Sequence, residues 1–242
     1  MALIPHDVFN DMIKHADIKT LWQLSNTDKT IKQICMDNPF YKVLLKFSTN
    51  PYFNLDAKST VLDNFLNDLV GNDIEMLKRL QTSFGACLMG KNISNQIIVL
   101  DGFSNGKSTF LELIGKLFGD MYMRGAGLSE EDSKYYNNTH IVRLYDTSDW
   151  PMNFVSRLKY LSEDNPKFTM VIDPDTGHLA SNDQDFNKRL NNFNFRTTYV
   201  NNPHHSGEKL KQPNMLNQLL LDGALPALLN FLLEGCREVL DN

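Results

Sequence analysis

Residues 97–118 constrain the fold of this chain more strongly than any other stretch. Residues 97–100, IIVL, form a continuous apolar run typical of a short strand buried on both faces, and the run stops at Asp101-Gly102. From Phe110 to Phe118 apolar residues recur at helical spacing, and Gly119-Asp120 is a stop signal. The sequence therefore predicts a strand, a tight turn and a helix, in that order.

The turn between the predicted strand and helix reads SNGKST over residues 104–109. A phosphate-binding loop needs this order, because backbone N–H groups of the turn and of the helix N-terminus surround the phosphates, a lysine reaches the β and γ oxygens, and a hydroxyl coordinates Mg²⁺. Lys107 and Ser108 match the last two roles. We expect ATP and Mg²⁺ to be held here by Gly102, Ser104, Asn105, Gly106, Lys107, Ser108 and Thr109.

The first glycine of the turn stands one place later than in the general pattern. The pattern G-x-x-x-x-G-K-[ST] would put it at Asp101, whereas the chain has Gly102. Two interpretations stay open: the turn absorbs the shift, or the site has lost its nucleotide. An ordinary strand-turn-helix without a ligand is the alternative to both.

Composition excludes several classes of protein. The 242 residues suffice for one large or two small domains, and 42% hydrophobic with 22% charged residues is typical of a soluble globular chain. A net charge of -5 gives no bulk attraction to nucleic acid, so a DNA contact needs a local basic patch. Cys35, Cys87 and Cys236 lie far apart and indicate buried thiols in a reducing compartment. With neither a membrane span nor a signal peptide, we expect an intracellular protein without a membrane partner.

Residues 1–47 are expected to form a helical module of their own. Three short helices begin near Ile4-Pro5, Asp17 and Thr27, and the centre reads LWQLS over residues 21–25. With PFYK at residues 39–42, this pattern resembles an F-box motif, and that resemblance implies docking onto a ubiquitin-ligase adaptor. A small helical cap is the alternative. The turn formers of residues 48–59 predict a linker.

Apolar spacing predicts a helix over residues 61–70 that continues to Gly85, where the chain reads LQTSFGACLMG over residues 80–90. Residues 185–195 read DFNKRLNNFNF, and a closing helix of leucines runs from Met215 to Glu234-Gly235. With the SNGKST loop, these segments give residues 60–242 a pattern that resembles the superfamily 3 helicase domain of the poxvirus-type primase-helicases of large DNA viruses. It implies an α/β P-loop ATPase core, AAA+-like, with a central, mainly parallel sheet.

An acidic residue is expected where the strand of residues 141–145 ends. We place that strand beside the strand that precedes the phosphate loop, so that Asp146 would hold Mg²⁺ with Ser108 and polarise the attacking water. Asp149 is the alternative, and a capped turn without a catalytic role is a third interpretation. Residues 123–139 are expected to be a surface loop or short helix without chemistry.

The resemblance also implies a contact between subunits. Arg189 matches the arginine that reaches the neighbour's nucleotide in a homo-oligomeric ring such as a hexamer; a solvated helix face is the alternative. The family's sensing asparagine should follow the strand of residues 168–172, but this chain offers Asp173 or Asp175. The hairpin that grips single-stranded DNA is not found near residues 162–166, and residues 201–213 are predicted to be a flexible loop.

Two functions follow from these patterns. The first is an ATP-binding, Mg²⁺-dependent helicase-like protein of a large DNA virus, with Lys107, Asp146, Asp149 and Arg189 as catalytic candidates and single-stranded DNA as a partner. The second is a degenerate, helicase-derived scaffold that binds partners through its N-terminal helices. For either, the expected location is the host cytoplasm, at the virus factory, or the virion.

Overall fold

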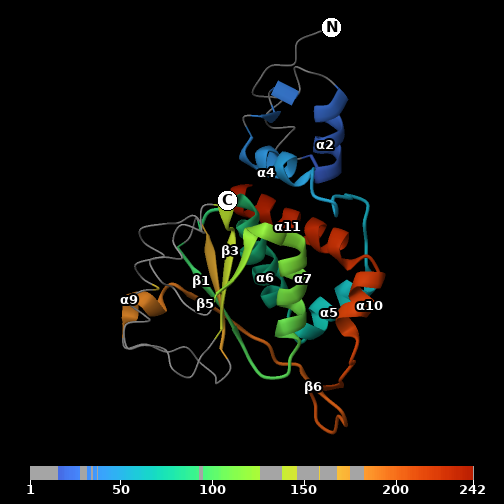
Figure 1. The fold of residues 1–242 in the computed structure, drawn as a ribbon, viewed down its shortest axis with the longest axis vertical. Helices are drawn as coiled ribbons and strands as arrows, with labels where there is room; N and C mark the ends of the chain where they lie inside the picture. Colours follow the sequence, from blue (N-terminus) through green and yellow to red (C-terminus); the bar gives the residue numbers. More distant parts are fainter. Residues whose placement is uncertain are drawn as a thin grey trace.

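A sheet of parallel strands with helices on its faces forms the centre of the molecule (Figure 1). This computed structural model describes residues 16–27, 32–33, 35–36, 38–92, 95–125, 138–145, 158, 168–174 and 183–241. The central sheet consists of β1 (Ile97–Asp101), β2 (Tyr122–Gly125), β3 (Ile141–Tyr145), β4 (Thr169–Asp173) and β5 (Leu190–Asn194).

The strand order is β2-β3-β4-β1-β5, and every neighbouring pair is parallel. The α/β class with a central parallel sheet is therefore confirmed. One expectation is wrong: β3 does not lie beside β1, because β4 pairs with both strands and separates them. Since all five strands run the same way, the segments that follow β1, β3 and β4 emerge at one edge of the sheet, its carboxyl edge.

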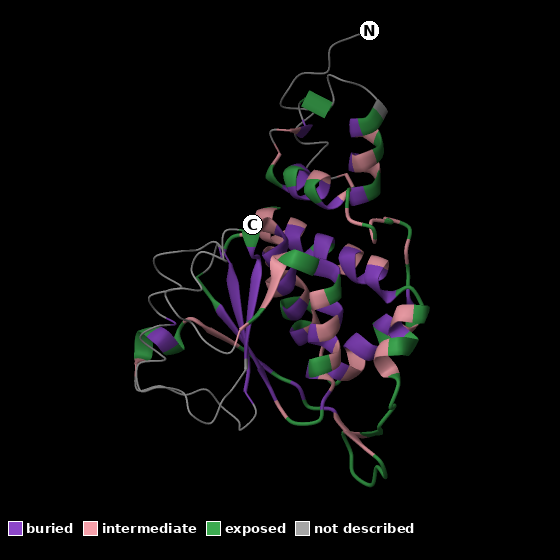
Figure 2. Ribbon diagram, viewed as in Figure 1, coloured by how far each residue is buried: buried purple, intermediate pink, exposed green. Residues whose placement is uncertain are grey.

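Alternate residues of β1 face two separate apolar clusters, and the whole strand is buried (Figure 2). Ile98 and Leu100 belong to the larger cluster, which the helices cover. Ile97 and Val99 belong to the smaller one, together with Phe186 of the short helix α9 (Gln184–Asn187) on the other face. This burial on both faces explains the unbroken apolar run of the sequence.

The larger cluster is formed by α5 (Thr60–Leu69), α6 (Ile74–Ala86), α7 (Lys107–Phe118) and α11 (Ala224–Asp241). The expected helix from residue 61 to Gly85 is wrong in one respect, because it breaks after α5. Gly71 and Asn72 have φ angles of 65° and 61°, which no helix tolerates, and Asp73 then caps α6 by accepting a hydrogen bond from the Met76 amide. A short 3₁₀ helix, η1 (Cys87–Met89), follows α6.

The closing leucine helix is also two helices. α10 (Met215–Leu221) ends before Gly223, whose φ is 72°, and α11 continues past the expected stop at Gly235. At Gly235 an added Cβ would lie 2.1 Å from the carbonyl oxygen of Gln81, so this glycine lets α11 lie directly against α6.

The N-terminal helices α2 (Ile18–Thr27) and α4 (Pro39–Phe47) lie at one end of the molecule (Figure 1). Asn38 caps α4 by accepting a hydrogen bond from the Tyr41 amide. The buried side chains of α4, including Phe40, Leu44 and Phe47, belong to the larger apolar cluster. The helix expected near Ile4-Pro5 lies outside the described residues, and the division at residues 47 and 60 stays a prediction.

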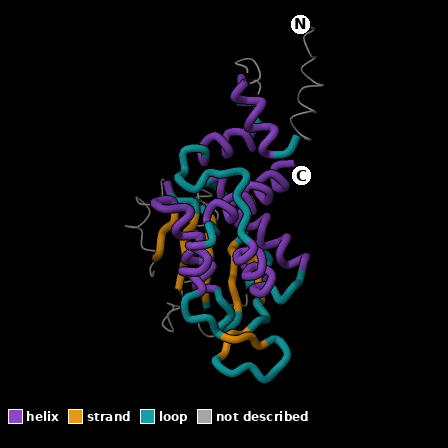
Figure 3. The backbone as a smooth tube through the Cα atoms, turned by 90° about the vertical axis from the view of Figure 1, so that its right-hand side faces the viewer, coloured by secondary structure: helices purple, strands orange, loops and turns teal. Residues whose placement is uncertain are grey.

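Two strands occupy segments that the sequence predicted to be loops. β2 includes residues 123–125 and pairs with β3 after the 3₁₀ helix η2 (Gly119–Met121). β7 (Glu208–Leu210) pairs with β6 (Thr198–Val200) in a small ribbon that projects beyond the carboxyl edge of the sheet (Figures 1 and 3). Each strand is short and is stabilised by its partner rather than by its own composition.

In the part of the chain that the structure describes, no single helix has the length and apolar composition of a membrane span. Among the described helices, only α10 and α11 taken as a pair have that length and composition, and they are bent by 84° relative to each other. Cys35, Cys87 and Cys236 are free and buried, as expected.

His140, the residue before β3, forms side-chain hydrogen bonds with α4 and with the 3₁₀ helix η1. Its Nδ1 lies 2.8 Å from the carbonyl oxygen of Cys87, which only accepts, so Nδ1 carries the proton. Its Nε2 then accepts from the ammonium of Lys46 at 2.7 Å. Burial, with the Lys46 charge, lowers the pKa of His140 to about 4.

This depressed pKa predicts that acid weakens the fold. The unfolded chain binds a proton at His140 more readily than the folded chain, so stabilisation that is complete above about pH 6.5 is lost as the pH falls toward 4. Between about pH 7 and pH 5, urea unfolding should show a loss of about 1–2 kcal/mol from this residue. His140→Gln should flatten that slope, whereas His204→Gln in the exposed ribbon should not. An unchanged slope in His140→Gln would contradict this assignment.

Candidate phosphate-binding site

The turn after β1 is fixed by one buried asparagine. The side-chain amide of Asn105 donates to the carbonyl oxygen of Asp101 at 3.1 Å, and its Oδ1 accepts from the Lys107 amide at 3.3 Å. The side chain thereby bridges the end of the strand and the start of α7. Every second residue of the turn has a positive φ angle: 108° at Gly102, 51° at Ser104 and 91° at Gly106.

Gly102 has a structural reason for its position. A Cβ there would lie 2.3 Å from the Asn105 amide nitrogen and 2.8 Å from the carbonyl oxygen of Phe195. Asp101 does not need this freedom, because it is the last residue of β1 and pairs with Asn194. The turn therefore takes up the displaced glycine, and the shift does not by itself disrupt the loop.

Two hydrogen bonds connect the ribbon to the turn. The Tyr199 amide donates to the carbonyl oxygen of Ser104 at 2.7 Å, and the Ser104 hydroxyl donates to the carbonyl oxygen of Tyr199 at 2.9 Å. These reciprocal bonds offset the left-handed conformation of Ser104, which costs a non-glycine residue about 1 kcal/mol or more.

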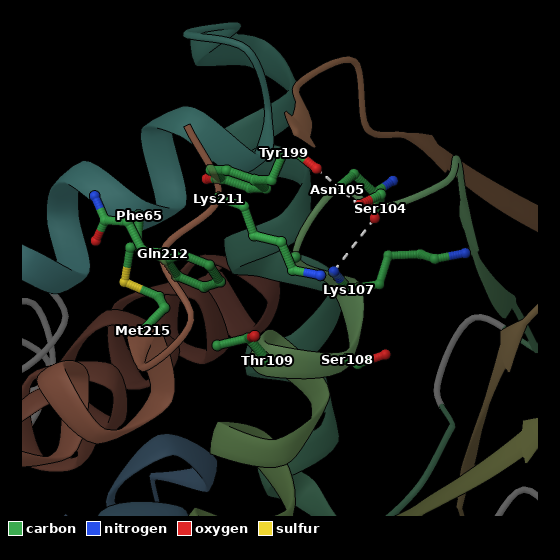
Figure 4. Close-up of a pocket in the computed structure, with 11 residues that line it drawn as sticks. Phe65, Ser104, Asn105, Lys107, Ser108, Thr109, Tyr199, Lys211, Gln212 and Met215 are labelled. Carbon is green, nitrogen blue, oxygen red and sulfur yellow. Dashed lines mark hydrogen bonds between the residues drawn. The ribbon is translucent and has the colours of Figure 1, made fainter. Parts of the chain in front are cut away.

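A cavity of about 320 Å³ opens between the turn, α5 and the ribbon (Figure 4). Its lining combines the SNGKST residues with rings and polar groups and includes two lysines and, among the residues that the structure describes, no carboxylate. It is lined by Phe65, Ser104, Asn105, Gly106, Lys107, Ser108, Thr109, Tyr199, Lys211, Gln212 and Met215.

Two aromatic rings form the apolar side of this cavity. A Cβ at Gly106 would lie 3.2 Å from the ring of Phe65 and 3.4 Å from that of Tyr199, so both rings pack against the turn. The Tyr199 hydroxyl stays neutral, because burial and the nearby Asp68 raise its pKa to about 12. Phe103 does not line the cavity, and the residue is 81% exposed.

The Lys107 side chain leaves the cavity on the side of the sheet (Figure 4). Its ammonium lies 3.0 Å from Asp173 Oδ1, at the end of β4, and donates to the carbonyl oxygen of Pro174 at 3.2 Å. Asp173 Oδ2 accepts from Arg143 of β3 at 2.5 Å. All three side chains are at most 10% exposed, so one buried carboxylate is shared by two cations.

The other predicted catalytic residues do not join this arrangement. Asp146, Asp149 and Asp175 lie outside the described residues. Arg189 follows α9, and its carbonyl oxygen accepts from the Ile97 amide where β1 begins. That is the edge of the sheet opposite the cavity, so Arg189 does not face the cavity of its own chain. Its role at a neighbouring subunit stays a prediction, and the hairpin segment near residues 162–166 is also outside the described part.

Sequence reasoning missed Phe65, Tyr199 and Lys211 as residues of the site. Phe65 reads as one apolar position of an amphipathic helix, and Lys211 stands in a polar segment with the composition of a loop. Neither the amphipathic helix around Phe65 nor the polar segment around Lys211 predicts a cavity, because the cavity forms only when α5 and the ribbon pack against the turn. Asp173 was named as a stand-in for the sensing asparagine, but its contact with Lys107 was not predicted.

Three solved structures of the NrS-1 C-terminal region share the fold of this chain. An A-form apo structure has a TM-score of 0.53 at 15% identity and covers 74% of this chain and 48% of its own. The apo structure of residues 305–718 has a TM-score of 0.55 at 15% identity, and the match covers 79% of this chain and 51% of that structure. An A-form apo structure of the same region has a TM-score of 0.52 at 13% identity, and the match covers 77% of this chain and 50% of that structure. This chain spans about half the length of the structures it matches, and at such identities the likeness concerns the fold alone.

Neither a scan against protein-family models nor a search of curated proteins finds a match. The resemblance of residues 1–47 to an F-box therefore has no support from these comparisons.

The shared carboxylate predicts an order of stabilities. Asp173→Asn removes the carboxylate that both buried cations contact and should cost about 3–5 kcal/mol, whereas Lys107→Met keeps the Arg143–Asp173 pair and should cost less, about 1 kcal/mol. Urea unfolding of the two variants measures both. A Lys107 variant as unstable as the Asp173 variant would show that the pair with Arg143 does not balance the site.

Proposed function

We propose that this chain is a helicase-related nucleotide-binding protein that holds Mg²⁺-ATP in the cavity of the SNGKST loop. The observation that carries the proposal is the lining of the cavity, in which a turn at a helix N-terminus meets Lys211 and no carboxylate among the described residues, with Lys107 beside it paired to Asp173. Such a site favours a polyphosphate, because amide N–H groups and cations both stabilise its charge.

The apolar side of the cavity suits the rest of a nucleotide. The rings of Phe65 and Tyr199 and the thioether of Met215 would contact the base or the sugar, while the turn binds the phosphates. Sites for small molecules often combine an apolar wall with a few polar groups in this way.

Magnesium fits the residues present. Ser108, exposed in the first turn of α7, would contribute its hydroxyl, and Mg²⁺ in nucleotide sites takes most of its other ligands from phosphate and water. No cluster of three or more histidine, cysteine or acidic side chains that could hold a metal occurs among the residues described. Asp146 remains the proposed second protein ligand. The bound metal would supply charge neutralisation on the transferred phosphate.

We further propose that the chain hydrolyses ATP at an interface between subunits of a ring, with Arg189 reaching the neighbouring site and single-stranded DNA as the partner. The resemblance to superfamily 3 helicases supports this finer assignment. In it Lys107 must leave Asp173 and turn toward the phosphates, which then replace the carboxylate as its counter-charge.

A second function is favoured by that same ion pair. A lysine held by a buried carboxylate and a carbonyl oxygen can stay there, and the chain would then bind nucleotide weakly and act as a scaffold derived from a helicase.

Titration with Mg²⁺-ATP and assays of ATP turnover separate the two functions. Wild type should bind ATP, and Lys107→Ala should weaken binding by about 10-fold or more, since a charged hydrogen bond is worth about 1.5–3 kcal/mol. Lys116→Ala, an exposed lysine at the far end of α7, is the matched control and should bind as wild type does.

Turnover by wild type above the Lys107→Ala background, with or without single-stranded DNA, supports the ATPase. Binding without turnover supports the scaffold. Absence of ATP binding by wild type would refute the nucleotide site itself.

A further inference from the structure

Lys211 is the lysine whose side chain extends into the cavity. Figure 4 shows its ammonium reaching toward the start of α7, whereas the Lys107 side chain leaves on the opposite side. Lys211 is exposed and forms no side-chain hydrogen bond or ion pair with any residue that the structure describes. Its charge is thus available in the cavity, while that of Lys107 is already shared with Asp173.

Main-chain hydrogen bonds place Lys211 relative to the turn. Its amide donates to the carbonyl oxygen of Val200 at 2.8 Å, and the adjacent Tyr199 amide donates to the carbonyl oxygen of Ser104 at 2.7 Å. Two bonds therefore connect the backbone of Lys211 to the backbone of the loop.

The ribbon that carries Lys211 is itself attached to α5. Lys209 forms an ion pair with the Asp68 carboxylate, and the Thr197 hydroxyl donates to the backbone carbonyl oxygen of Asp68. Lys209 and Lys211 thus have different roles: the first is neutralised and attaches the ribbon, and the second is left without a carboxylate partner among the described residues.

We propose that Lys211 is a second phosphate-binding residue, which contacts the phosphate chain of a nucleotide from the side of the cavity opposite α7. This inference rests on the proposed nucleotide site and adds a cation from the same chain to it. Because Lys211 needs no prior release from a carboxylate, it engages the incoming polyphosphate while Lys107 still pairs with Asp173. The phosphate charge then draws Lys107 away from Asp173, and both lysines hold the same chain of phosphates.

A charge series tests this role. Titrations with ATP, ADP and adenosine, with Mg²⁺ present, should show that Lys211→Gln weakens ATP binding by about fivefold, in keeping with an exposed cation, and leaves adenosine unaffected. Lys211→Arg should restore most of the ATP affinity, and Lys116→Gln should match wild type. The ATP defect should shrink when salt rises from about 0.05 M to about 0.5 M, because salt screens an exposed charge.

The outcomes separate the two proposals. Equal loss of ATP and adenosine binding by Lys211→Gln, or ATP binding as tight as in wild type, overturns the role of Lys211 and leaves the nucleotide site standing. Weakened binding of a single-stranded oligonucleotide with unchanged ATP binding also overturns it and assigns the lysine to DNA. Absence of ATP binding by wild type overturns both proposals together.

Discussion

One buried carboxylate balances two cations at the carboxyl edge of the sheet, and the geometry of the candidate site depends on this balance. Lys107 and Arg143 come from α7 and β3, and Asp173 lies on β4 between them. Burying either cation alone would cost several kcal/mol, so the pairings fix where both side chains lie. An anion that enters the cavity can attract the Lys107 ammonium away from this carboxylate.

The same edge shows how a cavity arises from elements distant in sequence. The side chain of Asn105 hydrogen-bonds to two backbone groups within the turn after β1, and Tyr199 of the ribbon hydrogen-bonds to Ser104. These bonds together fix the shape of the turn. The rings of Phe65 and Tyr199 then pack around Gly106, the glycine that leaves them room. The backbone of a loop held in this way is fixed before a ligand binds, whereas the Lys107 side chain has to leave Asp173 to reach that ligand.

The sequence predicted well what local chemistry determines. The apolar run of β1 and the helical spacing of α7 were correct, because burial on both faces of a strand and on one face of a helix leave distinct patterns. The break between α5 and α6 was missed, since the apolar period continues across Gly71 and Asn72. Strands β2 and β7 were missed because their pairing partners, rather than their composition, make them strands.

The contacts of the site could not be predicted, because they depend on sheet order. The position of β4 between β1 and β3 brings Asp173 to Lys107, and no spacing within the chain encodes that neighbourhood. A crystal structure with Mg²⁺ and a non-hydrolysable ATP analogue would test the central claim most directly. We expect the phosphates on the amides of residues 104–107 and the Lys107 ammonium on a phosphate oxygen, away from Asp173. A nucleotide bound elsewhere, or Lys107 still on Asp173 beside bound phosphates, would contradict the account.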